Sequence, residues 1–300
     1  MNHIVILGGT NQDIFAYSHQ QIKLNDSNPG YLKESFGGVG RNIAENLARL
    51  KLNPTLITAI GNDEIGKNII SEGSKIGISF DSIWIEKTPK YLAVINQNKD
   101  MLVAIAAMDD VEKMTVNQIT DKLDALKAAD LLIIDTNYSK EVLTYVFDQV
   151  KAPIFVEAIS TIKAEKLKPF YSKIQLLKLN LVEAQSLSNI NGETKFDIEK
   201  IGIYFYHQKV KEILITLGNQ GAYYFDGKNH QFVKGKNIEI ENTTGAGDAF
   251  FAGAIYAKIH DMNILSCGIA SSIITLKDEK AVSPYMNPQY LLKTIKEYQL

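Results

Sequence analysis

Short apolar segments alternate with helical segments through the middle of the chain, and this alternation restricts the fold more than any other feature. Helical patterns cover residues near 117 to 128 and 139 to 150. Strands that are apolar throughout and separated by helices are typical of a parallel sheet covered on both faces. We therefore predict an α/β fold with a mostly parallel central sheet between two helical layers. The predicted strands of this region are Leu131 to Asp135, Pro153 to Glu157, Ile174 to Leu179 and Glu212 to Thr216.

Composition limits the size of the core and the class of partner. The 300 residues are 45% hydrophobic and 22% charged, which suits one large domain with a small appendage or two domains. The 32 basic and 34 acidic residues leave a net charge of −2, so we expect neither a nucleic-acid nor a membrane partner. The single cysteine, Cys267, excludes an internal disulfide and a cysteine-based metal cluster. Without a signal peptide or a membrane-spanning run, we expect a cytoplasmic protein.

Residues 241 to 253 indicate a loop that turns abruptly into a buried helix. Gly245 and Gly247 leave the backbone N–H groups of the first helical turn open, and these donors together with the helix dipole form an anion site. Asp248 lies in the same turn. A carboxylate beside an anion site can accept the proton of a hydroxyl that attacks a phosphoryl group. The plainer interpretation is a Gly-rich turn in which Asp248 is an ordinary N-terminal helix residue.

The N-terminal strand, Ile4 to Leu7, ends at Gly8-Gly9 and is followed by Asn11 and Asp13. Ligands of open α/β sheets bind beyond the carboxyl ends of the strands, so this polar pair faces the predicted pocket. An amide and a carboxylate can donate to and accept from vicinal hydroxyls. A turn rich in Asn and Asp is the alternative.

Two further segments predict a small sheet over the mouth of that pocket. Residues 14 to 36 show no helical periodicity and indicate short strands with a turn, and residues 90 to 95 and 101 to 107 predict a hairpin. Together, about 14–36 and 88–107 would form a lid that excludes water from the reaction. The unpaired edges of such a lid also suggest a homodimer.

Two glycine-rich segments are similar to phosphate-binding loops but depart from them at one position each. Residues 37 to 42, Gly-Gly-Val-Gly-Arg-Asn, open an amphipathic helix but lack the third glycine of a dinucleotide fingerprint, because Ile43 stands in its place. Residues 61 to 68 come close to a P-loop but carry Asn68 where Ser or Thr would bind magnesium. We therefore prefer a strand-to-helix connection with Asp63 as the helix cap.

The pattern of motifs resembles the ribokinase (PfkB) family of sugar and nucleoside kinases over nearly the whole chain. The motifs that carry the resemblance are Gly37–Asn42, Asn180-Leu-Val-Glu183, Thr216-Leu-Gly218-Asn-Gln-Gly221 and Asn242-Thr-Thr-Gly-Ala-Gly-Asp248. The resemblance implies a single ribokinase-like domain over residues 1–300, three layers of α/β/α, and ATP-dependent transfer of phosphate to a hydroxyl. A catalytically inactive sugar-binding regulator on the same fold is the non-enzyme alternative.

The resemblance assigns roles to individual positions of this sequence. Asp248 would be the general base, and the 245–247 amides, including that of Ala246, would hold the transferring phosphoryl group. Glu183 would position Mg²⁺, usually through water. The residues expected to contact the acceptor are Asn11, Asp13, Gly38, Asn42, Ser27 and Asn28. Asn137 and Lys163 are added because they follow strand ends, although a solvated side chain is the plainer interpretation of Lys163. Those expected to contact ATP are Asn180, Thr216, Gly218, Gly221, Thr244 and Asn287.

Within the family, the segments Asp26–Gly30, Gly37–Ala44 and Met101–Ile105 are similar to the branch that phosphorylates pseudouridine. A lid lined by Ser27 and Asn28 suits the amides and carbonyls of a uracil edge. Another nucleoside or sugar kinase, such as a ribokinase, is the alternative. Many relatives carry Asp where this chain has Asn242. A neutral side chain attracts a monovalent cation less strongly, so K⁺ dependence is an open alternative.

Overall fold

The computed structural model describes residues 3–98 and 100–300, and its core is a large sheet in the order β13-β12-β11-β10-β9-β8-β1-β4-β5. The strands from β11 to β5 run parallel, whereas β12 and β13 are antiparallel at one edge. The prediction of a mostly parallel sheet is confirmed. The strands are β1 Ile4–Leu7, β4 Thr55–Gly61, β5 Ser79–Ile85, β8 Leu131–Asp135, β9 Ile154–Glu157, β10 Leu176–Asn180, β11 Glu212–Thr216, β12 Gly221–Phe225 and β13 His230–Lys234.

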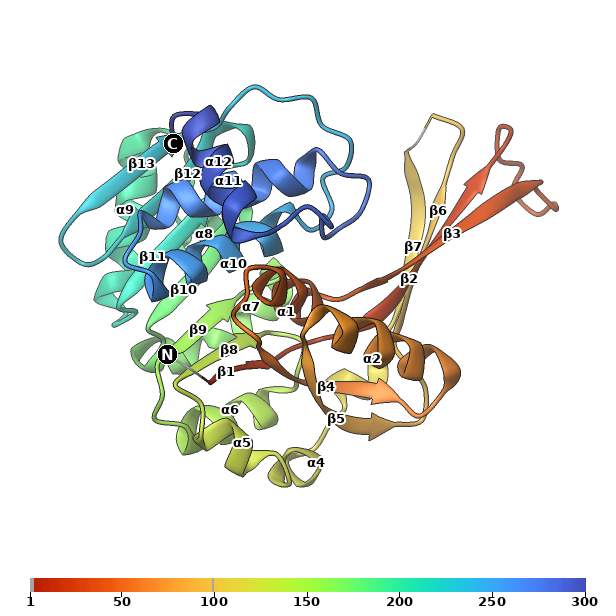
Figure 1. Cartoon of the computed structure of the whole chain (residues 1–300), viewed down its shortest axis with the longest axis horizontal. Helices are drawn as coiled ribbons and strands as arrows, with labels where there is room; N and C mark the ends of the chain where they lie inside the picture. Colours follow the sequence, from red (N-terminus) through yellow and green to blue (C-terminus); the bar gives the residue numbers. More distant parts are fainter. Residues whose placement is uncertain (1–2, 99) are drawn as a thin grey trace.

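Helices cover both faces of this sheet (Figure 1). Successive side chains of a strand point to opposite faces, so Ile4 and Ile6 join one buried cluster and Val5 and Leu7 the other. One layer contains α1 Val39–Arg49, α2 Glu64–Ile76, α10 Ala246–Ile259 and α11 Ile264–Leu276, with α12 Pro288–Glu297 packed on α11. The other contains α3 Asp109–Glu112, α4 Val116–Thr120, α5 Leu123–Lys127, α6 Lys140–Gln149, α7 Thr161–Ala164, η1 Glu165–Lys173, α8 Leu181–Ser188 and α9 Lys195–His207.

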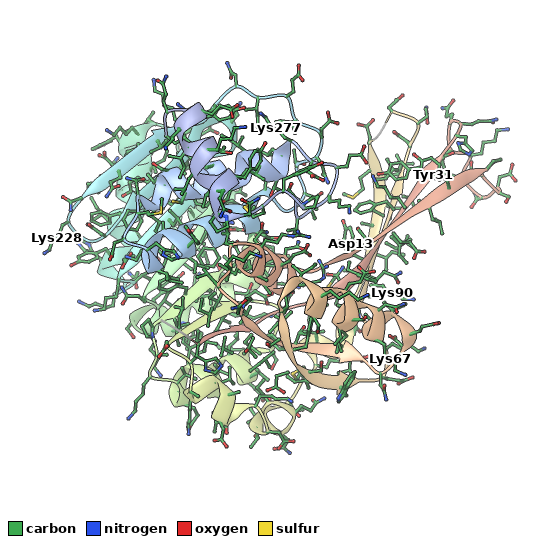
Figure 2. The ribbon with its side chains drawn as sticks, viewed as in Figure 1. Asp13, Tyr31, Lys67, Lys90, Lys228 and Lys277 are labelled. Atoms are coloured by element: carbon green, nitrogen blue, oxygen red, sulfur yellow. The ribbon has the colours of Figure 1, made fainter. Side chains whose placement is uncertain are left out.

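A second sheet, in the order β3-β2-β6-β7, projects from the body (Figure 1). We call it the small sheet. The predicted hairpin is confirmed, and β2 begins at Asn11, three residues before the region predicted to be extended. Asp13 lies where the small sheet joins the body and Tyr31 lies in its outer part (Figure 2). The strands are β2 Asn11–Ser18, β3 Gly30–Gly37, β6 Lys90–Ile95 and β7 Met101–Ala107.

The predicted helix near 117 to 128 is wrong, because the segment forms two short helices, α4 and α5. The backbone N–H of Lys122 bonds the carbonyl of Ile119, three residues back, and this tighter turn interrupts the helical ladder. Lys122 also pairs with Asp81 of β5 at 2.5 Å. The predicted cap at Asp63 is confirmed, since its side chain accepts the amide of Gly66. In the described part of the chain, none of the helices is long and apolar enough to cross a bilayer.

Candidate active site

Polar residues converge where the parallel strands end. Asp135 is the last residue of β8, Glu157 the last of β9, and Lys178 and Asn180 close β10. These strands are neighbours in the sheet, so their carboxyl ends share one edge. An edge of this kind is where open α/β sheets bind ligands.

The first turn of α10 lies at this edge and is shaped by two glycines. Gly245 caps the helix with φ 77° and no side-chain cap, and a Cβ there would stand 1.9 Å from the carbonyl oxygen of Ala281. A Cβ on Gly247 would lie 3.2 Å from Nζ of Lys178. The turn therefore combines backbone N–H donors, the positive end of a helix and a nearby ammonium group. This is the chemistry of an anion site.

Asp248, partly buried in the same turn, accepts a hydrogen bond from Nδ2 of Asn42 on α1 at 2.8 Å. Burial raises the pKa of Asp248 to about 6, and the charges of Asp135 and Asp13 act in the same direction. The Asn42 bond and the positive charge of Lys178 oppose that rise. A carboxylate with such a pKa is ionised near neutral pH yet basic enough to take up a proton.

Lys178 and Glu157 form a buried pair that the sequence analysis missed. The Nζ of Lys178 lies 2.8 Å from Oε1 of Glu157, and both side chains are buried. Burial raises the pKa of Glu157, although the positive charge of Lys178 opposes the shift. Burial alone would lower the pKa of Lys178, but the Glu157 carboxylate outweighs it and the net direction is upward. The available signal was a lysine inside the otherwise apolar run Leu176–Leu179.

Asp135, also missed, fixes the glycine loops that border the site. Its Oδ2 accepts the backbone N–H of Gly9 at 2.7 Å and that of Gly40 at 3.1 Å. Gly38 has φ 99°, and a Cβ there would stand 2.5 Å from the carbonyl oxygen of Gly9. Close approach of these backbones brings α1, and with it Asn42, against the end of β1.

The predicted acceptor residues Asn11 and Asp13 lie on the same side of the site, at the start of β2. Nδ2 of Asn11 donates to Oδ1 of Asp13 at 2.6 Å. Burial raises the pKa of Asp13, while the Asn11 bond and the charge of Arg41 oppose the rise. The structure therefore brings Asn11, Asp13, Gly38 and Asn42 together around the approach to Asp248.

Asn137 and Lys163 meet in a cavity next to Asn11. Nζ of Lys163 donates to Oδ1 of Asn137 at 2.8 Å, and Nδ2 of Asn137 donates to Asp135 at 3.0 Å. Glu112 lies 3.5 Å from the same Lys163 ammonium group. The cavity is lined by Gly9, Thr10, Asn11, Pro89, Met108, Val111, Glu112, Asn137 and Lys163.

Ser27 and Asn28 lie elsewhere, in the loop between β2 and β3 at the outer end of the small sheet (Figure 1). Both are exposed. The Asn28 side chain bonds the backbone of Lys23 through both its oxygen and its nitrogen. In this conformation, the structure does not bring these two residues to Asp248.

On the other side of Asp248, the Asn180 motif closes β10 and begins α8. Asn180 and Glu183 form a capping box. Oδ1 of Asn180 accepts the backbone N–H of Glu183 at 2.9 Å, and Oε2 of Glu183 accepts the backbone N–H of Asn180 at 2.8 Å. Burial raises the pKa of Glu183, against the effect of the Asn180 amide. Within residues 3–98 and 100–300, no group of three or more His, Cys, Asp or Glu side chains is arranged to hold a metal ion. One carboxylate fits a magnesium ion held mainly by phosphates and water.

Thr216 ends β11 beside this motif, and its hydroxyl contacts the carbonyl of Leu179 at 3.5 Å. Gly218 has φ 60° and open space where a Cβ would stand, so a ligand can approach its backbone. Gly221 serves the β12–β13 pairing instead, since a Cβ there would be 2.0 Å from the carbonyl oxygen of Val233.

The three remaining predicted residues make local backbone contacts. Oδ1 of Asn242 accepts the Thr244 amide at 2.9 Å, and its Nδ2 donates to the carbonyl of Glu279 at 2.8 Å. Asn287 caps α12 by accepting the Tyr290 amide. These bonds order the loops on either side of Gly245, whose backbone packs against Ala281.

Comparison with known proteins shows the family and the fold of the chain. Residues 1–274 match the model of the pfkB family carbohydrate kinases. The chain is 34% identical to the pseudouridine kinase of Escherichia coli K12 over 258 residues, which is 84% of this chain and 82% of that protein. A carbohydrate kinase from Agrobacterium tumefaciens superposes with a TM-score of 0.87 at 25% identity, covering 99% of this chain and 97% of that one.

A more distant structure shows the same fold. Arabidopsis thaliana ribokinase, complexed with ribose and ATP, superposes with a TM-score of 0.85 at 19% identity, covering 98% of this chain and 99% of that one. Kinases of this family transfer phosphate from ATP to an alcohol group of a small molecule. The whole-chain family match and the residues gathered around Asp248 lead to one assignment. The chain belongs to the pfkB family of carbohydrate kinases.

Proposed function

We propose that the protein transfers the γ-phosphate of ATP to the 5′-hydroxyl of pseudouridine, giving pseudouridine 5′-phosphate and ADP. The observation that carries the proposal is the position of Asp248 beside the glycine-rich turn of α10, where a base and an anion site act on one reacting group. The 34% identity to the Escherichia coli pseudouridine kinase supports the choice of acceptor.

In the proposed mechanism, Asp248 accepts the proton of the 5′-hydroxyl as its oxygen forms a bond to the γ-phosphorus. The bond between that phosphorus and the bridging oxygen of ADP breaks at the same centre. The 245–247 amides stabilise the charge on the transferring group, and Lys178 adds a positive charge beneath Gly247. Asn11, Asp13, Gly38 and Asn42 would hold the ribose so that its 5′-oxygen points at the phosphate.

Glu183 would hold Mg²⁺ through water, and when bound the ion neutralises charge on the ATP phosphates. The side chain fits this role because its capping bond to the Asn180 amide fixes one carboxylate oxygen at the end of β10. The residues that would border the nucleotide are Asn180, Thr216, Gly218, Thr244 and Asn287. Binding of a K⁺ ion near Asn242 is kept as an alternative and is not part of the proposed mechanism. The reason is that both polar atoms of the Asn242 side chain already bond backbone groups.

The small sheet would act as the lid over the acceptor. It joins the body at Asn11 and Asp13, so its movement would open or cover the ribose site. Its outer strands expose apolar side chains at Leu32, Val103 and Ile105. A lid of this composition would shed water when it meets the nucleoside or a second copy of the chain, and we propose a homodimer through this surface.

A panel of acceptors tests the proposed reaction. ADP release is measured with pseudouridine, uridine, ribose, adenosine and fructose, each with Mg-ATP, together with a blank that reports hydrolysis. We expect the highest kcat/KM with pseudouridine. Turnover with ribose alone would assign a ribokinase instead, and binding without any turnover would support the sugar-binding regulator.

A further inference from the structure

The cavity beside Asn11 has a polar side that the proposed mechanism does not use. Glu112, the last residue of α3, faces Lys163 of α7 across this side, with Oε1 and Nζ 3.5 Å apart. The Lys163 side chain is 21% exposed and is held from within by its 2.8 Å bond to Asn137, whereas the Glu112 side chain is 52% exposed. An acceptor and a donor therefore stand side by side, with the acceptor freer to meet a ligand.

Apolar side chains complete the cavity. Pro89 and Met108 flank β6 and β7 of the small sheet, and Val111 precedes Glu112 on α3. In this conformation the cavity has room for about one water molecule, so a flat ring would pack between such groups only once Pro89 and Met108 move with the small sheet. Its polar edge would then meet Glu112 and Lys163. Asn11 lines the same cavity and bonds Asp13, so a nucleoside whose ribose meets this pair has its base directed to this side.

Pseudouridine and uridine differ at this edge by one hydrogen-bond donor. The two bases have the same shape, and with the ribose held alike, N1–H of pseudouridine takes the place of C5–H of uridine. The neighbouring carbonyl is present in both, as C2=O in pseudouridine and C4=O in uridine. The edge of pseudouridine is therefore a donor next to an acceptor, and that of uridine is a C–H group next to an acceptor.

We infer that Glu112 selects pseudouridine by accepting its N1–H, while Lys163 donates to the adjacent carbonyl. The inference rests on the proposed function. Uridine would satisfy Lys163 but leave the Glu112 carboxylate facing a carbon, and a polar group left unpaired is what rejects an analogue that lacks a donor. Glu112 is thus a specificity residue, and Lys163 binds both nucleosides.

The test compares kcat/KM for pseudouridine and uridine in the wild type, Glu112→Ala, Glu112→Gln and Lys163→Met. We expect Glu112→Ala to lower kcat/KM for pseudouridine about 10- to 100-fold, because a bond to a charged acceptor is lost only with pseudouridine. For uridine, kcat/KM should stay unchanged or rise, because the carboxylate that would stand unpaired against this nucleoside is gone. Glu112→Gln retains an acceptor oxygen and should keep part of the preference. Lys163→Met should lower both values by a similar factor.

The matched control is Asp110→Ala, which removes an exposed carboxylate from the same short helix but not from the cavity. This variant should leave kcat/KM unchanged for both nucleosides, and thermal unfolding of each variant checks the fold. If the wild type turns over pseudouridine and Glu112→Ala keeps the wild-type preference, or loses both nucleosides equally, this inference is overturned and the proposed function stands. If the wild type does not turn over pseudouridine, the proposed function fails and this inference fails with it.

Discussion

The side-chain amide of Asn42 donates a hydrogen bond to Oδ2 of Asp248 at 2.8 Å, joining residues 206 positions apart. The bond links α1, which borders the proposed ribose site, to the first turn of α10, which carries the proposed anion site. Asn42 is itself buried. The orientation of the proposed base therefore depends on the packing of two helices and not on a mobile loop.

Replacing Asp248 by Asn should lower kcat by about 10² to 10⁴, because the general base is lost while the shape of the site is kept. Steady-state ADP release gives the rate, and calorimetric titration with pseudouridine should show nearly unchanged affinity. Asp226→Asn, in the exposed turn between β12 and β13, is the control and should retain full activity. An Asp248→Asn enzyme with normal turnover would contradict the assigned chemistry.

The rate should depend on pH through the ionisation of Asp248. Burial raises the pKa of this carboxyl in the free protein to about 6, so kcat/KM should rise with pH, reach half its maximum near pH 6 and level off above pH 7. The Asn42 bond lowers that pKa. Asn42→Ala should therefore move the midpoint to higher pH, whereas a merely structural loss would lower the plateau without moving the midpoint. The measurement is kcat/KM for the nucleoside from pH 5 to 9.

Much of the scaffold could be predicted from local patterns. Most of the parallel strands of the central sheet carry largely apolar runs, with Lys178 inside β10 as an exception. The start of α10 carries glycines at the two positions where a Cβ would meet a neighbouring group. The order Gly-Ala-Gly-Asp therefore predicted the glycine-rich turn and the carboxylate within it together. Periodicity failed at residues 117 to 128, because Ile119 and Leu126 are buried seven residues apart in either arrangement.

The pairings within the site could not be predicted in this way. Lys178 meets Glu157 because β10 lies beside β9 with these two residues in register, and a strand pattern does not contain that register. Lys163 meets Glu112 through the packing of two short helices. Asn28 shows the opposite case. Its amide was predicted to contact the edge of a base, but in the structure it bonds the backbone of its own loop.

Removing only one member of the buried Lys178–Glu157 pair should lower the free energy of unfolding. Lys178→Met leaves the Glu157 carboxyl buried without its partner, which typically lowers the free energy of unfolding by about 3 to 5 kcal/mol. The double variant Lys178→Met, Glu157→Leu removes both charges and should recover most of that stability. Urea unfolding measures both effects.

Activity measurements separate the structural role of Lys178 from its proposed role in catalysis. The double variant should remain slow even though it is stable, because the positive charge beneath Gly247 is gone. The midpoint of its kcat/KM profile should lie at higher pH than that of the wild type, since Lys178 lowers the pKa of Asp248. A stable double variant with wild-type kcat would limit Lys178 to a structural role.

Gly245→Ala and Gly247→Ala should both lower activity, but for different reasons, although they add the same methyl group two residues apart. At position 245, φ is 77° and the methyl would collide with the carbonyl of Ala281, so we expect a loss of stability above about 1 kcal/mol together with a loss of activity.

At position 247, the nearest atom is the terminal Nζ of Lys178 at 3.2 Å, so the fold should survive. There the methyl would occupy the space above the lysine and keep a phosphate from the open amides, so kcat and ATP affinity should fall while Tm stays near that of the wild type. Thermal unfolding with and without Mg-ATP separates the cases, and a Gly247→Ala protein that Mg-ATP stabilises as strongly as the wild type would argue that the phosphate binds elsewhere.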